Sequence, residues 1–417
     1  MSRPVRPGLS CFTVLFIAAG AAYAADDPLR IETYVEIVLR SNPGARAGRA
    51  LEETGEAERQ SARLLPDPGF DVAVDRARPT DAGEGRETET GLQLSQTLPW
   101  LPARSASIEA ADRAAEARRA EATRVRWNLV SDARVAFYRL QETRVLVDVA
   151  RDAEQDAGSL LNLISRRTES GEAREVDRIK ARVEWLRQQR DLKAAGRDAA
   201  AAEAVVRALA VEPLPRPLVI QGDLPEPSAD ARVTDEALER AMPQSPELMR
   251  ARAEAARSQS LLSFARRSRV PDLGVSLFWN KEIDKDLYGL SFGFTLPLWN
   301  AKRGEISLAT AASSLAEANA GRVLVQLQTE LETRRQALDI AAGQAAMLMT
   351  DLGPAAAEAL RIARLLFEEG ETSLLDLLDA QRTARETQRE VIRARFELAV
   401  ALSELQRLLG PDFTTGR

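Results

Sequence analysis

The sequence is poor in the side chains that carry out most covalent and metal chemistry. It contains no histidine, and its one cysteine is Cys11, near the N-terminus. A chain without histidine cannot build a Ser-His-Asp triad or a histidine metal site. One cysteine cannot form a disulfide framework. We therefore expect neither an enzyme nor a bound cofactor or metal.

The N-terminus has the pattern of a secretory signal peptide. Arg3 and Arg6 precede the mostly apolar segment CFTVLFIAAGAA, and the AYA sequence at 22–24 resembles a cleavage site. Cleavage after Ala24 would remove Cys11 and two basic residues, changing the net charge from −6 to −8. An acidic exported chain argues against a nucleic-acid partner. No later apolar run reaches the roughly 18 residues of a transmembrane helix, so a membrane-spanning form would have to use strands.

The rest of the chain has the pattern of an internal duplication. Matching landmarks recur at offsets of 205 residues from Pro66 to Pro271, 198 from Pro99 to Pro297 and 199 from Gly171 to Gly370. The predicted order begins with a signal peptide at 1–24 and a first repeat at 25–209, which contains a helix, strands near 67–77 and 88–98 and long helices near 102–170 and 173–210. A proline-rich connector follows at 210–232. The second repeat, at 233–410, contains a helix, strands near 271–280 and 287–297 and long helices near 299–368 and 373–409, and a tail follows at 411–417.

The strands of the second repeat alternate clearly between two kinds of side chain. Apolar residues at 273, 275, 277 and 279 alternate with residues such as Gly274 and Ser276, and Tyr288 begins a similar run. An aromatic face opposite a small or polar face is typical of strands between lipid and a water-filled lumen. A half-buried strand of a soluble sheet would look the same in any single run. Two such runs, joined by the charged segment 281–286, favour the membrane interpretation.

The predicted helices are unusually long. No proline occurs between 103 and 212, and only Pro354 interrupts 298–410. A helix from 102 to 170 would reach about 100 Å. Residues 391, 394, 398, 401, 405 and 408 have the 3-4 spacing of a coiled-coil seam. These helices are expected to form an extended hollow or rod-like assembly.

Each repeat passes from strand to helix through a Thr-Leu-Pro junction. Pro99 is followed by Trp100, and Pro297 by Trp299 two residues later. A proline at the end of a strand does little harm to the hydrogen-bonded ladder. A tryptophan beside it suits the headgroup boundary of a membrane, so we expect the strands to leave the lipid here.

Four strands per chain cannot close a barrel in lipid. An open sheet edge would leave backbone groups without partners, and the smallest outer-membrane barrels have about eight strands. Two chains would supply eight strands and little bore, whereas three would supply twelve. The strand count therefore favours a trimer.

Together these features resemble the TolC family of outer-membrane efflux proteins. The resemblance covers most of the chain after residue 24 and is most specific in LFEEGETSLLDLLDAQ and the seam that follows, at 366–410. It implies an α+β membrane protein whose long α-helical hairpins form a trimeric periplasmic α-barrel. Four β-strands per chain would contribute to a shared 12-stranded transmembrane β-barrel in the outer membrane of a Gram-negative bacterium, in contact with its lipid.

The same resemblance implies a passive conduit in a tripartite efflux system. Its partners would be a periplasmic adaptor (membrane fusion) protein and an inner-membrane resistance-nodulation-division pump. The segment LPLWNAKRGEI is most similar to the branch that exports heavy-metal cations. A conduit for drugs or organic compounds is the alternative within the family. A periplasmic coiled-coil adaptor or scaffold would share the long helices and the signal peptide, although it would not need the strand pairs.

The resemblance also suggests a gate. Asp376 and Asp379 match family positions whose carboxylates ring the periplasmic constriction, where they would attract cations. Asp177 lies at the place in the first repeat that corresponds to Asp376. The alternative for Asp376 and Asp177 is helix capping, since Ser373 and Asp376 have the spacing of a capping box.

The two predicted turns are the candidate contacts for the adaptor. They comprise Gly171, Glu172, Gly370, Glu371 and Thr372. A glycine that ends a helix with positive φ explains the two glycines without any partner. Some family members tie the closed turns through a tyrosine and an arginine that this chain lacks. We expect a closed state held by fewer bonds between helices, or by different ones, for example from Arg174 or Arg178 to Glu371.

Overall fold

The computed structural model describes residues 28–77, 87–227, 233–282, 285–295 and 301–410. The predicted cleavage site at Ala24, the junction residues Pro297 and Trp299, and the tail at 411–417 lie outside the described residues. The first half of the chain contains α1 (Ile31–Ser41), α2 (Pro43–Arg63), β1 (Gly69–Ala77), β2 (Glu87–Leu98), α3 (Leu101–Glu169) and α4 (Glu175–Ala210). The second half contains α5 (Asp235–Ala241), the 3₁₀ turn η2 (Met242–Gln244), α6 (Pro246–Arg267), β3 (Leu273–Lys281), β4 (Asp286–Gly293), α7 (Arg303–Met347), the π-helical segment η3 (Leu348–Leu352), α8 (Gly353–Glu369) and α9 (Leu374–Leu409).

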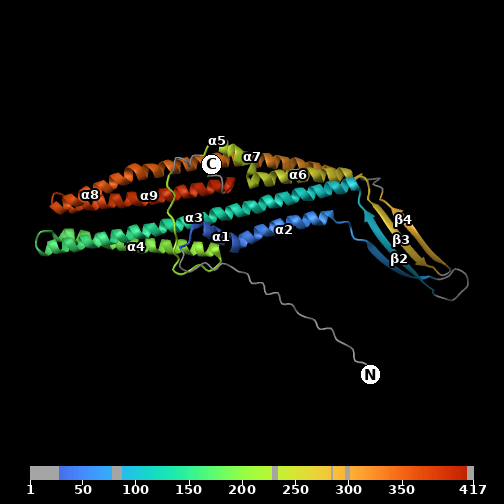
Figure 1. The fold of residues 1–417 in the computed structure, drawn as a ribbon, viewed down its shortest axis with the longest axis horizontal. Helices are drawn as coiled ribbons and strands as arrows, with labels where there is room; N and C mark the ends of the chain where they lie inside the picture. The colour runs from blue at the N-terminus through green and yellow to red at the C-terminus, as the bar shows by residue number, and fades with distance from the viewer. Residues whose placement is uncertain (1–27, 78–86, 228–232, 283–284, 296–300, 411–417) are drawn as a thin grey trace, which may run out of the picture.

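The molecule is a long rod with a small sheet at one end (Figure 1). The helix α3 runs along most of the rod as a single element of 69 residues, which corresponds to about 100 Å. The helices α2 and α6 pack beside its sheet-proximal part, and α4 packs beside the rest. Two hairpins, α3–α4 and α8–α9, end in turns at the end of the rod that is far from the sheet.

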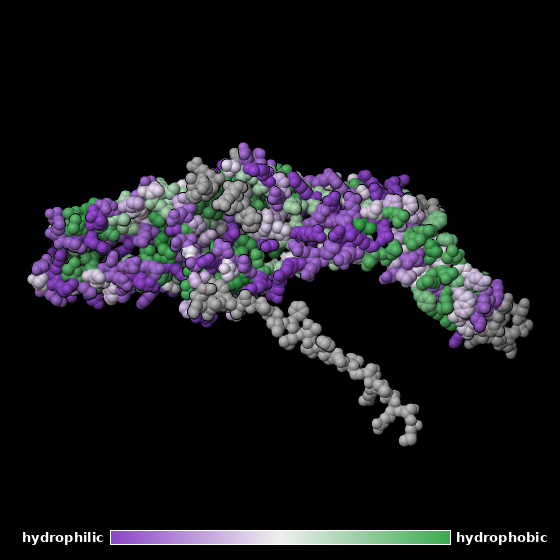
Figure 2. Space-filling view, in the orientation of Figure 1, coloured by the Kyte–Doolittle hydropathy of each residue, from purple (hydrophilic) through white to green (hydrophobic). Residues whose placement is uncertain are grey.

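The two halves of the chain meet in one antiparallel sheet of order β1-β2-β3-β4. The pairing of β2 with β3, which places Leu92 opposite Trp279, joins the halves. On one face, Leu277 lies opposite Leu290, and on the other, Ser276 lies opposite Ser291. The apolar face is exposed and forms the hydrophobic patch at the sheet end of the rod in Figure 2. Among the described residues, β1 and β4 each pair with one strand only, so the sheet of this part of the chain has two open edges.

The strand β4 is shorter than the sequence predicted. It ends at Gly293, whereas the expected strand reached 297. Its partner β3 begins at Leu273, directly after Pro271 and Asp272. In this register Leu273 would face Phe294, but the pairing ends with Gly274 opposite Gly293, so Phe294 lies outside the ladder.

The last long hairpin also differs from the prediction of one helix over 299–368. The helix α7 begins at Arg303, and the π-helical segment η3 separates it from α8. The cause is the Gly353-Pro354 pair that follows η3. Pro354 has no N–H for the α-helical bond to the carbonyl four residues earlier, and its ring crowds that carbonyl. A wider π turn accommodates this conflict without ending the helix.

Two large apolar clusters hold the middle of the rod together. The first joins α1, α3 and α4, where the Tyr34 and Phe137 rings lie 5.7 Å apart and the Tyr34 hydroxyl donates to the Val206 carbonyl at 3.0 Å. The second joins α7 and α9, where Leu398 and Leu405 of the predicted seam are fully buried. The seam prediction is therefore confirmed at these positions.

Candidate functional site

The hairpin turns are built around two glycines in the left-handed conformation. Gly171 has a φ of +83° and Gly370 a φ of +81°. In both turns the glycine and the next residue donate backbone hydrogen bonds to the end of the preceding helix, for example from Glu371 to the Leu366 carbonyl at 2.8 Å. This is a Schellman motif, in which glycine avoids the strain of a positive φ. Gly171, Gly370, Glu172 and Glu371 are exposed, and Thr372 is half-buried.

Asp376 forms the capping box that the sequence indicated. Its carboxylate accepts hydrogen bonds from the Ser373 hydroxyl at 2.6 Å, the Thr372 hydroxyl at 3.0 Å and the Ser373 backbone N–H at 3.1 Å. The hydrogen bond from the Ser373 hydroxyl, followed by those from Thr372 and the Ser373 backbone, lowers the pKa of Asp376. The carboxylate is therefore held in its charged form at the first turn of α9.

Asp379 and Asp177 lie in different surroundings. Asp379 is exposed. The pKa of Arg382 on the next turn is raised, mainly by its hydrogen bond and ion pair with Glu386 and to a smaller extent by the charge of Asp379. Asp177 is mostly buried and pairs with Arg174 at 3.0 Å. The chain alone therefore brings Asp376 and Asp379 to one exposed helical surface at the turn, while Asp177 is engaged within its own helix.

The ties expected from Arg174 or Arg178 to Glu371 are not present in the described chain. Arg174 bonds to Asp177 and Arg178 bonds to Glu175. Both partners lie three residues away on the same helix, so they are reached without bridging two hairpins. Within a single described chain, neither arginine contacts Glu371.

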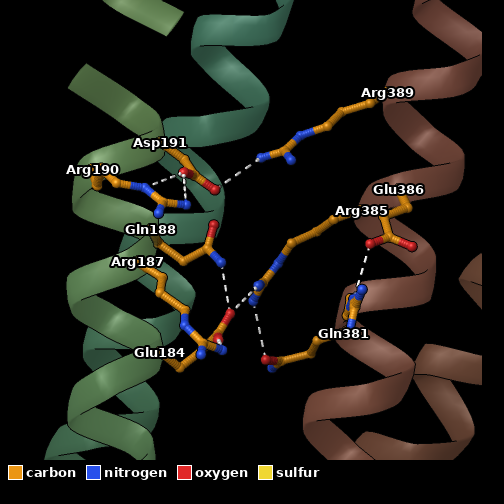
Figure 3. A network of polar contacts seen from close by, with 10 residues as sticks. Glu184, Arg187, Gln188, Arg190, Asp191, Gln381, Arg385, Glu386 and Arg389 are labelled. Atoms are coloured by element: carbon orange, nitrogen blue, oxygen red, sulfur yellow. Dashed lines mark hydrogen bonds and ion pairs between the residues drawn. The ribbon is translucent and has the colours of Figure 1, made fainter. Parts of the chain in front are cut away.

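A different polar network joins the two hairpins further from the turns. Figure 3 shows Arg385 of α9 reaching Glu184 of α4 at 3.0 Å. The side chains of Arg385 and Glu184 are only 12% and 17% exposed. Arg385 also donates to Gln381 at 3.0 Å, and Gln188 donates to Glu184 at 2.6 Å. A largely buried, multiply bonded ion pair is costly to break, so this pair is the strongest polar tie between the hairpins that the structure describes.

Two weaker ion pairs accompany the Glu184–Arg385 pair. Arg389 of α9 approaches Asp191 of α4 at 3.9 Å, and Arg364 of α8 approaches Asp156 of α3 at 3.1 Å. The second pair is about half exposed on both sides, so solvent weakens it. The sequence offered no signal for these pairs, because 29% of its residues are charged and many alternative partners exist.

The first strand-to-helix junction is anchored to the other half of the chain. The backbone N–H of Trp100 donates to the Asp272 carboxylate at 2.8 Å, just before β3. Arg267, at the end of α6, donates to the Pro102 carbonyl at 3.1 Å. Pro99 and Trp100 therefore lie where the sheet and the long helices meet, and the Trp100 side chain is exposed there.

Two further observations concern membranes and metals. No helix in the described ranges combines the length and the apolar character needed to cross a membrane. Within the same residues, no three acidic side chains are grouped closely enough to hold a metal ion.

Comparison with known proteins identifies the family. The family model described as outer membrane efflux protein matches residues 35–210 and 237–411. The chain belongs to the outer membrane efflux protein family. The two matched segments correspond to the two halves of the chain. The resemblance seen in the sequence is thus confirmed. The chain is an efflux channel protein of the outer membrane with a large periplasmic part.

Individual relatives of this efflux protein are similar over nearly their whole length. It is 26% identical over 388 residues to the cobalt-zinc-cadmium resistance protein CzcC of Cupriavidus metallidurans, covering 93% of this chain and 91% of the relative. It is 25% identical to the pyoverdine export outer membrane protein OpmQ of Pseudomonas putida, covering 88% and 82%. Its fold is similar to the open-state Neisseria gonorrhoeae MtrE outer membrane channel, with a TM-score of 0.78, 17% identity and coverage of 91% and 89%.

Proposed function

We propose that this efflux protein is the passive outer-membrane conduit of a tripartite system and acts as a homotrimer. The observation that carries the proposal is the sheet, which has two open edges and an exposed apolar face. In lipid such edges need partners, and three copies would supply them by pooling their strands into a shared barrel of twelve strands. The long helices would then line a periplasmic tunnel toward an adaptor protein and an inner-membrane resistance-nodulation-division pump.

Each segment of the chain would have its own role in this channel. Residues 1–24 would be removed as a signal peptide after Ala24. The two repeats, at 25–209 and 233–410, would each contribute two strands and one helical hairpin, with the connector at 210–232 between them and the tail at 411–417 after them. At the membrane, the strand-to-helix junctions Pro99, Trp100, Pro297 and Trp299 would mark the inner boundary of the lipid.

The turn end of the hairpins would carry the gate. Threefold symmetry would gather Asp376 and Asp379 from three chains into a ring of carboxylates that attracts cations. Asp177 would belong to the same constriction from the first hairpin. The exposed turns at Gly171, Glu172, Gly370, Glu371 and Thr372 would meet the adaptor. Support comes from the exposure of Asp376 and Asp379 at one end of the rod.

The exported substrate is proposed to be a heavy-metal cation. The likeness to a cobalt-zinc-cadmium resistance protein over 93% of this chain supports it. The likeness to a pyoverdine export protein favours a second candidate, a conduit for an organic compound. A periplasmic adaptor is disfavoured, because an adaptor has no need for the exposed apolar face of the sheet.

A complementation experiment with two neighbouring lysine substitutions tests this function. A strain that lacks the gene is expected to become several-fold more sensitive to cobalt, zinc and cadmium salts, and the wild-type gene should restore growth. Leu290 lies on the exposed apolar face of β4, and Ser291 on the opposite face. A lysine toward the lipid midplane costs about 2–4 kcal/mol, whereas a lumen-facing lysine is tolerated. Leu290→Lys should therefore fail to complement, while Ser291→Lys should succeed.

The possible results separate the candidates. If metal sensitivity is unchanged and sensitivity to siderophores or dyes appears, the organic-compound conduit is correct. If both lysine variants complement equally well, the β4 face does not meet lipid and the barrel proposal is wrong. Immunoblots of outer-membrane fractions would show whether each variant was exported and inserted.

A further inference from the structure

A groove of about 810 Å³ lies at the foot of the sheet, the end at which the strands meet the long helices in Figure 1. This volume is typical of small-molecule sites. Thr97, Gly274 and Gly293 lie side by side across three strands and line the groove. A Cβ added to Gly293 would meet nothing within 4 Å, so the row with two glycines leaves room for a ligand.

The groove opens on the face of the sheet that carries small and polar side chains. Gly293 lies two residues after Ser291, and residues two apart in a strand point to the same side. Leu290 and Phe292 point to the opposite, apolar side. In the proposed barrel the apolar side meets lipid, so the groove would face the lumen.

Positive charge dominates the lining of the groove. Among the described residues, the cations of Arg104, Arg269 and Lys302 line it together with one carboxylate, that of Asp272. Arg269 is exposed and makes no ion pair within the described chain. Lys302 has one long pair there, 3.7 Å from Glu305. A solvent-accessible pair of this length contributes little energy, so both cations are available to an added anion.

The other two charged groups of the groove are bonded to the backbone. The Arg104 guanidinium donates to the Arg63 carbonyl at 2.6 Å, and this neutral acceptor leaves its charge uncompensated. The Asp272 carboxylate accepts the hydrogen bond from the Trp100 N–H at 2.8 Å. The groove therefore has a net positive charge, which attracts anions and repels bare metal cations.

Apolar side chains line the same groove. Leu64, Val270 and Phe294 are 72%, 43% and 61% exposed. Covering such surface is favourable, since it removes apolar area from water. A ligand that used both parts of the groove would need an apolar body and an anionic group.

We propose that this groove binds an amphipathic organic anion, a molecule with an apolar body and a carboxylate or phosphate group. Arg269 and Lys302 would donate charge-assisted hydrogen bonds to the anionic group, while the apolar side chains cover the body. This inference rests on the channel proposed above, because the groove faces a lumen only in the trimer. A heavy-metal cation would pass this point most readily inside an anionic organic chelate. The groove thus narrows the chemical class of the cargo.

Titration with phenyl phosphate, which has an apolar ring and a phosphate group, tests the site. Calorimetry on the purified protein in phosphatidylcholine nanodiscs should show binding of this probe. Benzylammonium, of opposite charge, and inorganic phosphate, without the apolar ring, should bind much more weakly. Arg269→Glu should lower the affinity for phenyl phosphate at least about tenfold, because a like charge replaces a charge-assisted donor. Gly293→Leu should abolish binding without changing the charge, because the leucine fills the open space.

Arg266→Glu is the matched control for the change in net charge. Arg266 is exposed three residues before Arg269 and does not line the groove. Its replacement should leave the affinity within about twofold of the wild type, because solvent and salt screen a more distant charge.

The results separate the site from the channel. Equal losses for the two glutamate variants, or no binding by an intact trimer, would overturn the site and leave the trimeric channel standing. Binding that disappears in phosphatidylglycerol nanodiscs would assign the groove to a lipid headgroup and overturn its assignment to a solute of the lumen. A monomeric wild-type protein in native mass measurement would overturn the channel and the lumen site together.

Discussion

The two hairpins of this efflux protein share one plan but differ in the continuity of their helices. In the first, α3 runs without interruption for 69 residues, whereas in the second a π-helical segment separates α7 from α8. Both hairpins turn at a glycine with positive φ. Only the second restarts with a capping box, because Arg174, the residue at the N-cap of α4, makes no capping hydrogen bond with its side chain. Duplication has thus preserved the turn, while the interruption and the cap belong to the hairpin that carries Asp376 and Asp379.

The cores of the two hairpins differ as well. The first core packs many alanines, such as Ala133 and Ala136, around the rings of Tyr34 and Phe137. The second is dominated by leucines, including Leu327, Leu338 and Leu398. Alanine lets helices approach closely, whereas leucines fill a wider seam. A repeated sequence plan therefore does not require repeated packing.

The largest effect is expected from breaking the ion pair that holds the hairpins together. Arg385→Ala would leave Glu184 largely buried without its main partner, at a cost of about 3 kcal/mol in the free energy of unfolding. Arg382 on the same helix is the control, because its pair with Glu386 is 74% and 56% exposed. Arg382→Ala should cost about 0.5 kcal/mol or less. Denaturant unfolding in detergent measures both, and similar losses for the two variants would contradict the special role of Glu184–Arg385.

The next largest change in stability is expected from glycine replacements that distinguish the hairpin interrupted by the π-helical segment from the continuous α3–α4 hairpin. A Cβ added to Gly353 would lie 2.8 Å from the Leu348 carbonyl oxygen, whereas nothing lies within 4 Å of one added to Gly196 in α4. Gly353→Ala should therefore destabilise the protein by about 2 kcal/mol through overpacking. Gly196→Ala should stabilise it by about 0.5–1 kcal/mol, because alanine is the better helix former.

Thermal unfolding of these two variants and of Gly343→Ala gives the measurement. Gly343 lies in the second hairpin with open space around it, so its replacement should behave like that of Gly196. A loss of stability at both Gly343 and Gly353 would mean that the whole of the second hairpin, rather than the π-helical segment, resists alanine.

The parts that sequence reasoning predicted well are those set by local chemistry. The helix α3 begins and ends within one residue of the expected bounds, because a proline at its second position and Gly171 just beyond its end limit it. The alternation in β3 and β4 located the apolar face, since side chains in a strand point to opposite sides in turn. The capping box of Ser373 and Asp376 could also be predicted from the sequence, because its two residues lie three positions apart.

The parts that it missed depend on geometry that one sequence does not contain. Pro354 signalled a break in the helix, but whether the chain would kink, stop or form a π turn depends on the packing of Gly353 against Leu348 and Val391. The Glu184–Arg385 pair joins residues 201 positions apart, and each has closer charged neighbours in sequence. Long-range pairing of charges therefore emerged only from the relative placement of the two hairpins.

The smallest change in stability is expected at the N-caps of α4 and α9, the helices that follow the two turns. Ser373→Ala removes the N-cap of α9 and should cost about 1 kcal/mol. Arg174→Ser would place the same Ser-x-x-Asp spacing before α4, with Asp177 as the acidic partner. It should stabilise the first hairpin by about 0.5 kcal/mol, the low end of the capping range, because the ion pair between the exposed Arg174 and Asp177 is lost. If both substitutions destabilise equally, the first turn cannot adopt the capping geometry of the second.

The pH dependence of the same variants separates capping from general disruption. The pKa of Asp376 is lowered by the Ser373 and Thr372 hydroxyls and the Ser373 backbone. A lowered pKa in the folded state means that the contribution of Asp376 to stability is present above the ordinary aspartate pKa of about 4 and is lost as the pH falls through the lowered value. Ser373→Ala should therefore lose less stability than the wild type does between neutral and acidic pH. Melting curves that shift in parallel for the two proteins would show that Ser373 does not act through Asp376.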